Sequence, residues 1–205
     1  AINRGEKRKL LNVAVEPDQE QVAQSLKLTD IAKAERSEIV EMLLQSGLWT
    51  RIVERPYGVI ANPEAQPKAI FVSAFDSAPL APDYNFILKE EKAAVEAGMA
   101  VLARLTDGKV HLSARQGAEG YMAEVKGVEY HTFSGKHPVG NVGVQIHHID
   151  RIAKGDIVWT VNIQDVAMIG RSVLAGKVDM SKTIAVAGTK APKCGYKRII
   201  SGAAV

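Results

Sequence analysis

The stretch Ala69-Ile70-Phe71-Val72-Ser73-Ala74 decides the fold class of this chain. It is a short, continuous apolar run, which is typical of a strand that is buried on both faces of a sheet. A loop follows it, and residues 89–105 then carry the apolar stripe of a helix. Further strands are expected at 109–113, 128–133 and 156–160, the last entering a helix over 162–175. Because strands alternate with helices of this length, we predict an α/β domain around a largely parallel sheet.

The two ends of the chain have a different pattern. Apolar residues alternate over 11–16, which indicates the last hairpin of a small β domain. Two apolar runs, 183–188 and 197–200, enclose a Pro/Gly turn and predict a hairpin that starts a β-rich domain. The chain opens without Met in the turn-like Ile2-Asn3-Arg4-Gly5 and closes inside an apolar run. We interpret it as a fragment of a longer protein.

Composition excludes several classes of protein. The 205 residues carry a net charge of +3 with well-mixed signs, and no basic stripe with interleaved aromatic residues is present, so nucleic acid is not an expected partner. No apolar run is long enough to span a membrane, so we expect any membrane association to come through a partner. The single cysteine, Cys194, excludes an internal disulfide and a cysteine-ligated zinc or iron–sulfur site. It fits a reducing, cytosolic setting.

One loop gathers groups that could bind a flat ligand. A helix with Ser37 as its predicted cap should end at Gly47. The run Ser46–Arg51 and the following Arg55-Pro56-Tyr57 then place an indole, a phenol and two guanidinium groups on one loop. Aromatic faces and arginine donors suit a carbonyl-bearing ring such as a quinone. The alternative is a loop that anchors its aromatic rings in the core.

Ligands of open α/β folds bind where the strands end at their carboxyl edge. The polar residues expected there are Asp76 and Ser77, Arg115 and Gln116, and the Gly-rich run Ser134–Gly143. The Gly-rich run could cradle an anion, but it is neither G-x-G-x-x-G nor a Walker motif. A tight turn is therefore the favoured interpretation of it.

The histidines do not predict a metal site. Four of the five lie between residues 131 and 148, including His147-His148 near Asp150. Adjacent residues of a helix point about 100° apart, so these two rings rarely share one ion. A structural or solvent-exposed role is favoured, although a histidine near a quinone could relay protons.

Several motifs occur in the same order as in a known family. The chain resembles the A subunit of the bacterial Na+-translocating NADH:quinone reductase in Ile2–Lys9, Gln45–Thr50, Arg55-Pro56-Tyr57, Ala69–Asp76, Pro79-Leu80-Ala81, Gly135, His137-Pro138, Gly140 and Ile163–Val166.

The resemblance implies a fold and a setting. The complex lies in the bacterial inner membrane, passes electrons from NADH to ubiquinone in the respiratory chain and transports Na+ outward. The A subunit is its peripheral component on the cytoplasmic face, with the other subunits as partners. The implied fold class is α/β. Residues 1–25 would be the tail of a barrel-sandwich domain with a linker, 26–180 a Rossmann-like domain, and 181–205 the start of a β-grasp (SLBB) domain.

The resemblance also implies a binding role. Flavin-binding relatives of this fold have a glycine-rich loop after the first helix, whereas this chain has large side chains there, such as Trp49, Arg51 and Ile52. We therefore expect no flavin or iron–sulfur centre in this chain. In the family this component takes part in ubiquinone binding, and the candidate contacts in this sequence are Trp49, Arg51, Ile52, Arg55, Pro56 and Tyr57.

Three functions remain open from the sequence. The favoured one is an accessory subunit that helps to bind or position ubiquinone, the substrate of the complex, without a catalytic residue of its own. The second is a purely structural docking subunit. The third is a flavin-dependent oxidoreductase.

Overall fold

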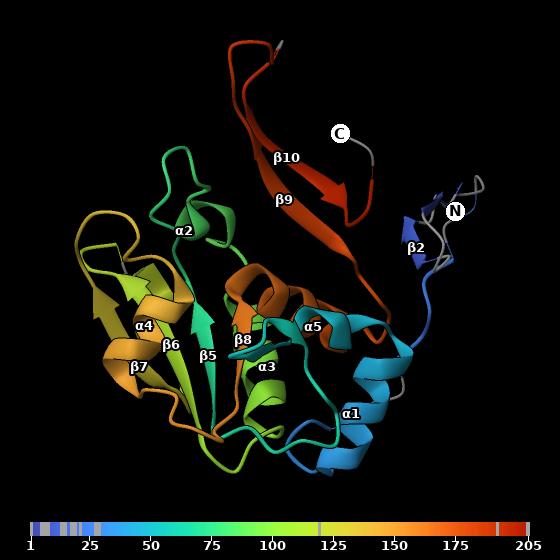
Figure 1. Cartoon of the computed structure of the whole chain (residues 1–205). Coiled ribbons are helices and arrows are strands. Elements are labelled where there is room, and N and C mark those ends of the chain that lie inside the picture. The colour runs from blue at the N-terminus through green and yellow to red at the C-terminus, as the bar shows by residue number, and fades with distance from the viewer. Residues whose placement is uncertain are drawn as a thin grey trace.

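The fold was analysed in a computed structural model. It describes residues 2–4, 9–12, 16, 20, 22–26, 30–118, 120–191 and 193–203. In these residues a six-stranded sheet with the order β4-β3-β8-β5-β6-β7 forms the centre, and two separate two-stranded hairpins lie outside it (Figure 1). The strands of the central sheet are β3 Val53–Arg55, β4 Val59–Ile60, β5 Ala69–Ser73, β6 Lys109–Arg115, β7 Glu129–Phe133 and β8 Val158–Asn162. The helices are α1 Arg36–Gln45, η1 Leu48–Arg51, α2 Tyr84–Ile87, α3 Lys92–Ala103, η2 Gly120–Glu124, α4 Val142–Ile149 and α5 Ile163–Ala175.

The predicted α/β class is confirmed, and the sheet is mixed. Strands β5, β6, β7 and β8 run parallel, whereas β3 pairs antiparallel with β8 and β4 antiparallel with β3. Residues 53–60 were expected to form a loop, which is wrong for the residues of β3 and β4. Strands of three and two residues are too short to show the alternation that marks a strand.

The helices cover the two faces of the sheet unequally. On one face α1, α3 and α5 pack with Trp159 and Val161 of β8 in a large apolar core. On the other face α4 packs Ile146 against Phe71 and Val158 in a smaller cluster. Figure 1 shows α4 and α3 on opposite sides of the strands.

Local signals explain where the helices begin and end. Helix α1 begins one residue before Ser37, which was the predicted cap. Its N-cap is Glu35, whose N–H donates to the Glu38 carboxylate at 2.8 Å. Gly47 follows α1 with φ +74°, as a helix-ending glycine does. Helix α3 is shorter than the predicted 89–105, because residues 88–91 form a turn after α2.

Helix α4 was not predicted, whereas α5 was. The Gly-rich run was expected to remain a loop through Gly143, but α4 starts at Val142. The glycine near its start and its length of eight residues hid the helical pattern. Helix α5 begins one residue after the predicted start and ends at the predicted Ala175. The Asn162 side chain accepts from the N–H of Gln164 at 2.9 Å, and Gly176 follows the helix with φ +64°.

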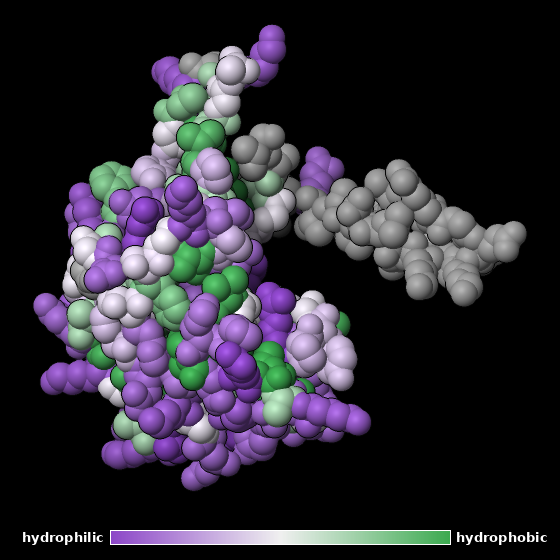
Figure 2. Space-filling model, turned by 60° about the vertical axis from the view of Figure 1, so that its left-hand side comes forward, coloured by the Kyte–Doolittle hydropathy of each residue, from purple (hydrophilic) through white to green (hydrophobic). Residues whose placement is uncertain are grey.

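The outer hairpins are β1 Ile2–Arg4 with β2 Lys9–Asn12, and β9 Ser181–Val186 with β10 Gly195–Ile200. The C-terminal hairpin was predicted. The turn expected at residues 2–5 is wrong for Ile2–Arg4, which forms β1, and Val13–Val15 lie outside the described residues. Figure 2 shows the C-terminal hairpin rising from the body, with hydrophobic residues along its stem and hydrophilic ones near its tip. The boundaries 1–25, 26–180 and 181–205 stay predictions.

Side chains of α5 hold the C-terminal hairpin against the body. The Gln164 side chain donates to the Thr183 carbonyl at 3.0 Å and accepts from the Thr183 N–H at 3.1 Å, as a neighbouring strand would. Arg171 donates to the Ser181 carbonyl at 2.7 Å and to the Asp179 carboxylate at 3.0 Å. The first strand of the hairpin is therefore fixed beside the start of α5.

Candidate functional site

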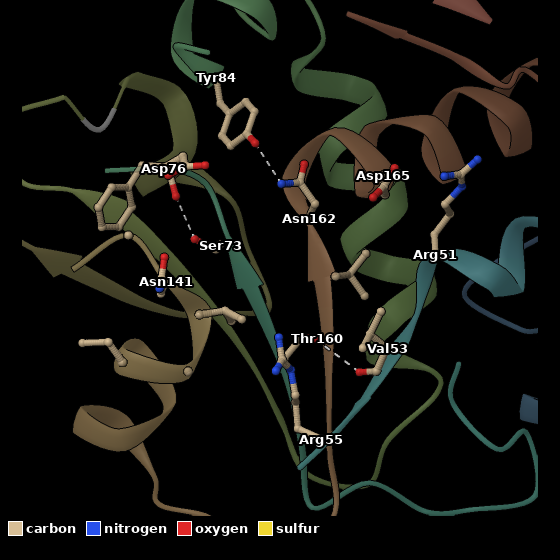
Figure 3. Close-up of a pocket in the computed structure, with 16 residues that line it drawn as sticks. Arg51, Val53, Arg55, Ser73, Asp76, Tyr84, Asn141, Thr160, Asn162 and Asp165 are labelled. Atoms are coloured by element: carbon tan, nitrogen blue, oxygen red, sulfur yellow. Dashed lines mark hydrogen bonds between the residues drawn. The ribbon is translucent and has the colours of Figure 1, made fainter. Parts of the chain in front are cut away.

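The candidate site lies at the point where the order of the parallel strands reverses. From β5 the chain proceeds through α3 to β6 and then β7, and it returns through α4 to β8 on the other side of β5. Open α/β folds bind ligands at such a point, beyond the carboxyl ends of the strands. A cavity of about 610 Å³ opens there (Figure 3).

Three walls enclose this cavity, which we call the switch-point cavity. Alternate residues of the segment from η1 into β3 form one wall, namely Arg51, Val53 and Arg55. Residues two apart on a strand point to the same face of the sheet, which explains this set. The ends of β5 and β8 form the floor, and the start of α4, residues 140–144, forms the third wall.

The wall at α4 is held by buried hydrogen bonds. Gln145, which is 1% exposed, donates to Ser73 Oγ at 3.0 Å and to the Gly140 carbonyl at 3.3 Å. The Gly140 N–H donates to Ser77 Oγ at 2.8 Å, and His137 Nδ1 lies 3.1 Å from the same oxygen. A Cβ at Gly140 would lie 2.3 Å from the backbone nitrogen of Ser77, so only glycine allows this approach. The loops after β5 and β7 therefore meet at the carboxyl edge, as predicted.

The end of β8 supplies a polar floor. Asn162 donates from Nδ2 to the Tyr84 hydroxyl at 3.0 Å while its Oδ1 caps α5. Burial raises the pKa of Tyr84, so its hydroxyl stays protonated at neutral pH. Asp165 also faces the cavity and lies 3.4 Å from Lys182 Nζ of β9. Tyr84, Asn162 and Asp165 were not predicted from the sequence to belong to the site. Asn162 and Asp165 could have been found, because they lie where a predicted strand passes into a predicted helix at the carboxyl edge of the sheet.

The two arginines of the β3 wall have unused donors. Both side chains are half-buried, and the Nε of each is buried without a hydrogen-bond partner. Figure 3 shows Arg55 pointing from β3 into the cavity, with Arg51 on the wall near Asp165. The cavity thus presents positive charge and N–H donors to whatever enters it.

The six predicted ligand contacts fall into three places. Trp49, 3% exposed, and Ile52 are buried in the core, where Trp49 Nε1 donates to the Ala61 carbonyl at 2.7 Å and its ring meets Trp159 edge-on at 5.4 Å. Arg51 and Arg55 line the cavity. Pro56 and Tyr57 lie on the exposed turn between β3 and β4, with Tyr57 75% exposed. The structure therefore places both arginines on the wall of one cavity and separates them from the rings.

The paired histidines and the cysteine lie away from the residues that line the cavity. His111 Nδ1 and His131 Nε2 lie 3.0 Å apart on neighbouring strands, and burial lowers the pKa of both rings. Cys194 is exposed in the turn of the C-terminal hairpin. Within the described part of the chain, no three His, Cys, Asp or Glu residues are grouped so that they could hold a metal ion.

Comparison with known proteins identifies the family. The sequence profile described as "NqrA second alpha/beta domain" matches residues 34–178. This chain belongs to the NqrA family. The match confirms the family expected from the sequence, and it contains the whole central sheet and the switch-point cavity.

Relatives in the NqrA family are named as the A subunit of a Na(+)-translocating NADH-quinone reductase. The protein of Saccharophagus degradans is 39% identical over 190 residues, which are 92% of this chain and 42% of that protein. The proteins of Neisseria gonorrhoeae and Serratia proteamaculans are each 39% identical over all of this chain and 46% of their own length. The chain therefore spans less than half the length of these relatives.

A solved structure supports the fold alone. The crystal structure of an NAD+-reducing [NiFe]-hydrogenase in the air-oxidized state matches with a TM-score of 0.54 and 15% identity, over 80% of this chain and 36% of that one.

No helix among the described residues has both the length and the hydropathy that crossing a membrane requires.

Proposed function

We propose that this chain is part of the NqrA component of a Na+-translocating NADH:quinone reductase, and that it helps to bind or position ubiquinone. The observation that carries this proposal is the family match over residues 34–178, together with the name that the relatives share. The other subunits of the complex would be its partners and would hold it at the cytoplasmic face of the membrane. Catalysis would belong to the complex, with no catalytic residue in this chain.

The cavity suggests how a quinone headgroup would be bound. Its two carbonyl oxygens are acceptors, and the guanidinium groups of Arg51 and Arg55, which line the same cavity, are donors. Val53, Phe75 and Val144 line the cavity and supply apolar surface for the ring. Pro56 and Tyr57, exposed on the next turn, are in a position to contact a neighbouring subunit or the isoprenoid tail.

The residues do not fit a flavin at the loop after α1. In that loop Leu48, Trp49 and Ile52 stand where a flavin-binding loop has glycines, and their side chains are buried in the core. A backbone that is packed in this way leaves no room for a flavin phosphate. We therefore propose that the chain has no flavin or iron–sulfur centre, which absorbance spectra of the purified protein would test.

Photo-crosslinking tests the quinone role. An azido-ubiquinone would be photolysed with the intact complex in phosphate-free buffer, with and without excess ubiquinone, and the labelled peptides mapped. Labelling of peptide 49–59 that ubiquinone suppresses is expected, and Arg55→Ala and Tyr57→Ala should weaken it. Arg151 lies outside the cavity, so Arg151→Ala is the matched control and should leave the labelling of peptide 49–59 unchanged.

A second function, structural docking within the complex, has one observation in its favour. Two of the six candidate contacts, Trp49 and Ile52, are buried in the core and offer no surface to a ligand. Labelling confined to other subunits of an active complex would favour docking over quinone binding.

A further inference from the structure

The switch-point cavity contains two guanidinium groups that have no hydrogen-bond or ion-pair partner among the described residues. In the described residues neither Arg51 nor Arg55 forms an ion pair, and the buried Nε of each lacks an acceptor. Five other arginines differ, because the Nε of each donates to an oxygen between 3.0 and 3.3 Å away: Arg36, Arg104, Arg151, Arg171 and Arg198. Arg115 makes no such bond within the described residues, but its side chain is exposed to water. A buried donor without an acceptor is unfavourable, because it has lost its hydrogen bonds to water. The exception at Arg51 and Arg55 therefore indicates a missing acceptor.

The carboxylates of the cavity do not supply that acceptor. Asp165 is committed to Lys182 of β9 at 3.4 Å. Asp76 accepts from the N–H of Ala78 at 2.8 Å and lies in the exposed loop after β5. Neither is within ion-pair distance of Arg51 or Arg55 among the contacts of the described residues. Counting Arg51, Arg55 and Lys182 against Asp76 and Asp165, the site has a formal charge of +1.

The wall opposite the arginines adds donors. Helix α4 starts there, its N-cap Asn141 makes no capping hydrogen bond through its side chain, and its first turn contains no acidic residue. The first N–H groups of a helix have no acceptor within the helix, which applies here to Val142 and Gly143. A Cβ at Gly143 would meet nothing within 4 Å, so the space before this turn is open.

We propose that the switch-point cavity binds a small phosphate-bearing molecule, with its oxyanion between the two arginines and the start of α4. A phosphate dianion matches two guanidinium charges, and its several oxygens can accept from donors on different walls. A neutral quinone supplies acceptors but not charge. A volume of about 610 Å³ is that of a site for a small ligand rather than for a protein segment. The proposal shares the arginines with the quinone role but does not depend on it.

Isothermal titration of the full chain with inorganic phosphate, with ionic strength held constant by NaCl, tests this. We expect saturable binding of one phosphate, at least tenfold weaker in Arg51→Gln and Arg55→Gln, because each removes charge-assisted hydrogen bonds. Arg151→Gln lies outside the cavity and should bind as the wild type does. Thermal unfolding of each variant verifies that it folds, which is expected because no hydrogen bond of Nε is lost.

Two further arms identify the source of the phosphate. One uses glycerol 3-phosphate, a soluble ester, and the other uses phosphatidylcholine vesicles with and without phosphatidic acid. Binding in either arm that depends on Arg55 supports the proposal. The arm with the higher affinity shows whether the phosphate belongs to a soluble ester or to a lipid headgroup. Absence of phosphate binding, or equal binding by Arg55→Gln and Arg151→Gln, overturns it. Binding of an acidic peptide without binding of phosphate also overturns it, in favour of a protein partner. Because no quinone is present, this result is independent of the crosslinking experiment.

Discussion

The contact between α3 and α5 makes Gly170→Ala the sharpest test of the fold. Both helices approach each other through glycines. A Cβ at Gly170 would lie 1.7 Å from the Ala94 carbonyl oxygen and 2.8 Å from the Gly98 nitrogen. A Cβ at Gly98 would lie 2.1 Å from the Val166 carbonyl oxygen. The two backbones are therefore in contact, with no space for a methyl group.

The structure sets the size of the expected effect. To bring the Ala94 oxygen from 1.7 Å to at least 3.0 Å, the helices must separate by about 1.3 Å. Overpacking typically costs about 1–3 kcal/mol, and here the upper end applies because a backbone carbonyl cannot rotate away. Alanine recovers about 1 kcal/mol of helix propensity. The unfolding free energy should therefore fall by about 2 kcal/mol or more, which for a chain of this size lowers Tm by about 4–8 °C.

Urea unfolding followed by tryptophan fluorescence measures this effect, since Trp49 and Trp159 are both buried in the core that α5 covers. Gly143→Ala is the matched control, because it makes the same substitution in α4 where the Cβ meets nothing. It should stabilise the protein by up to about 1 kcal/mol. A Gly170→Ala protein as stable as the wild type would refute the helix contact described here.

Further predictions concern the histidine pair, the C-terminal hairpin and the cavity. Burial lowers the pKa of His111 and of His131, so as the pH falls through about 6.5 the unfolded state takes up protons that the folded state does not. The unfolding free energy should therefore fall when the pH is lowered from 7.5 to 5.5. Urea unfolding at both pH values should show a smaller fall in His131→Asn, and an equal fall would contradict the assignment. Gln164→Ala removes two hydrogen bonds to Thr183 and should lower the local opening free energy of β9 by about 1–3 kcal/mol, measured by amide hydrogen exchange; unchanged exchange at Thr183 would exclude the anchor. Arg55→Met loses no hydrogen bond of Nε and should keep the unfolding free energy within about 1 kcal/mol of the wild type, whereas a larger loss would mean that the guanidinium has a structural partner.

The sequence predicts those parts of the fold that depend on long or strongly marked segments. The buried strand at 69–73 and the helix ending at Gly176 have local signals, a continuous apolar run and a cap at each end. Strand β3 and helix α4 lack such signals. Their structure depends on pairing with β8 and on packing against Phe71, which are contacts between segments far apart in the sequence.

The candidate site follows the same rule. Sequence reasoning placed Asp76 and the Gly-rich run at the carboxyl edge, because that depends on the alternation of strands and helices. It grouped Trp49 with Arg51 because the residues are neighbours in the chain. Only the position of η1 and β3 against the sheet sends the indole into the core and the guanidinium into the cavity.

The cavity itself results from the unequal covering of the sheet. Among the described residues, α4 is the helix that covers the face of the sheet carrying Phe71 and Val158. It lies over β5 rather than over β3. Antiparallel β3 extends the sheet past this helix, so Val53 and Arg55 face open space instead of an apolar core. A strand face that no helix covers can carry charged side chains without burying them fully. The same geometry that leaves the guanidinium groups unpaired therefore makes them accessible to a ligand, and it explains why one strand can be part of the sheet and of the site at once.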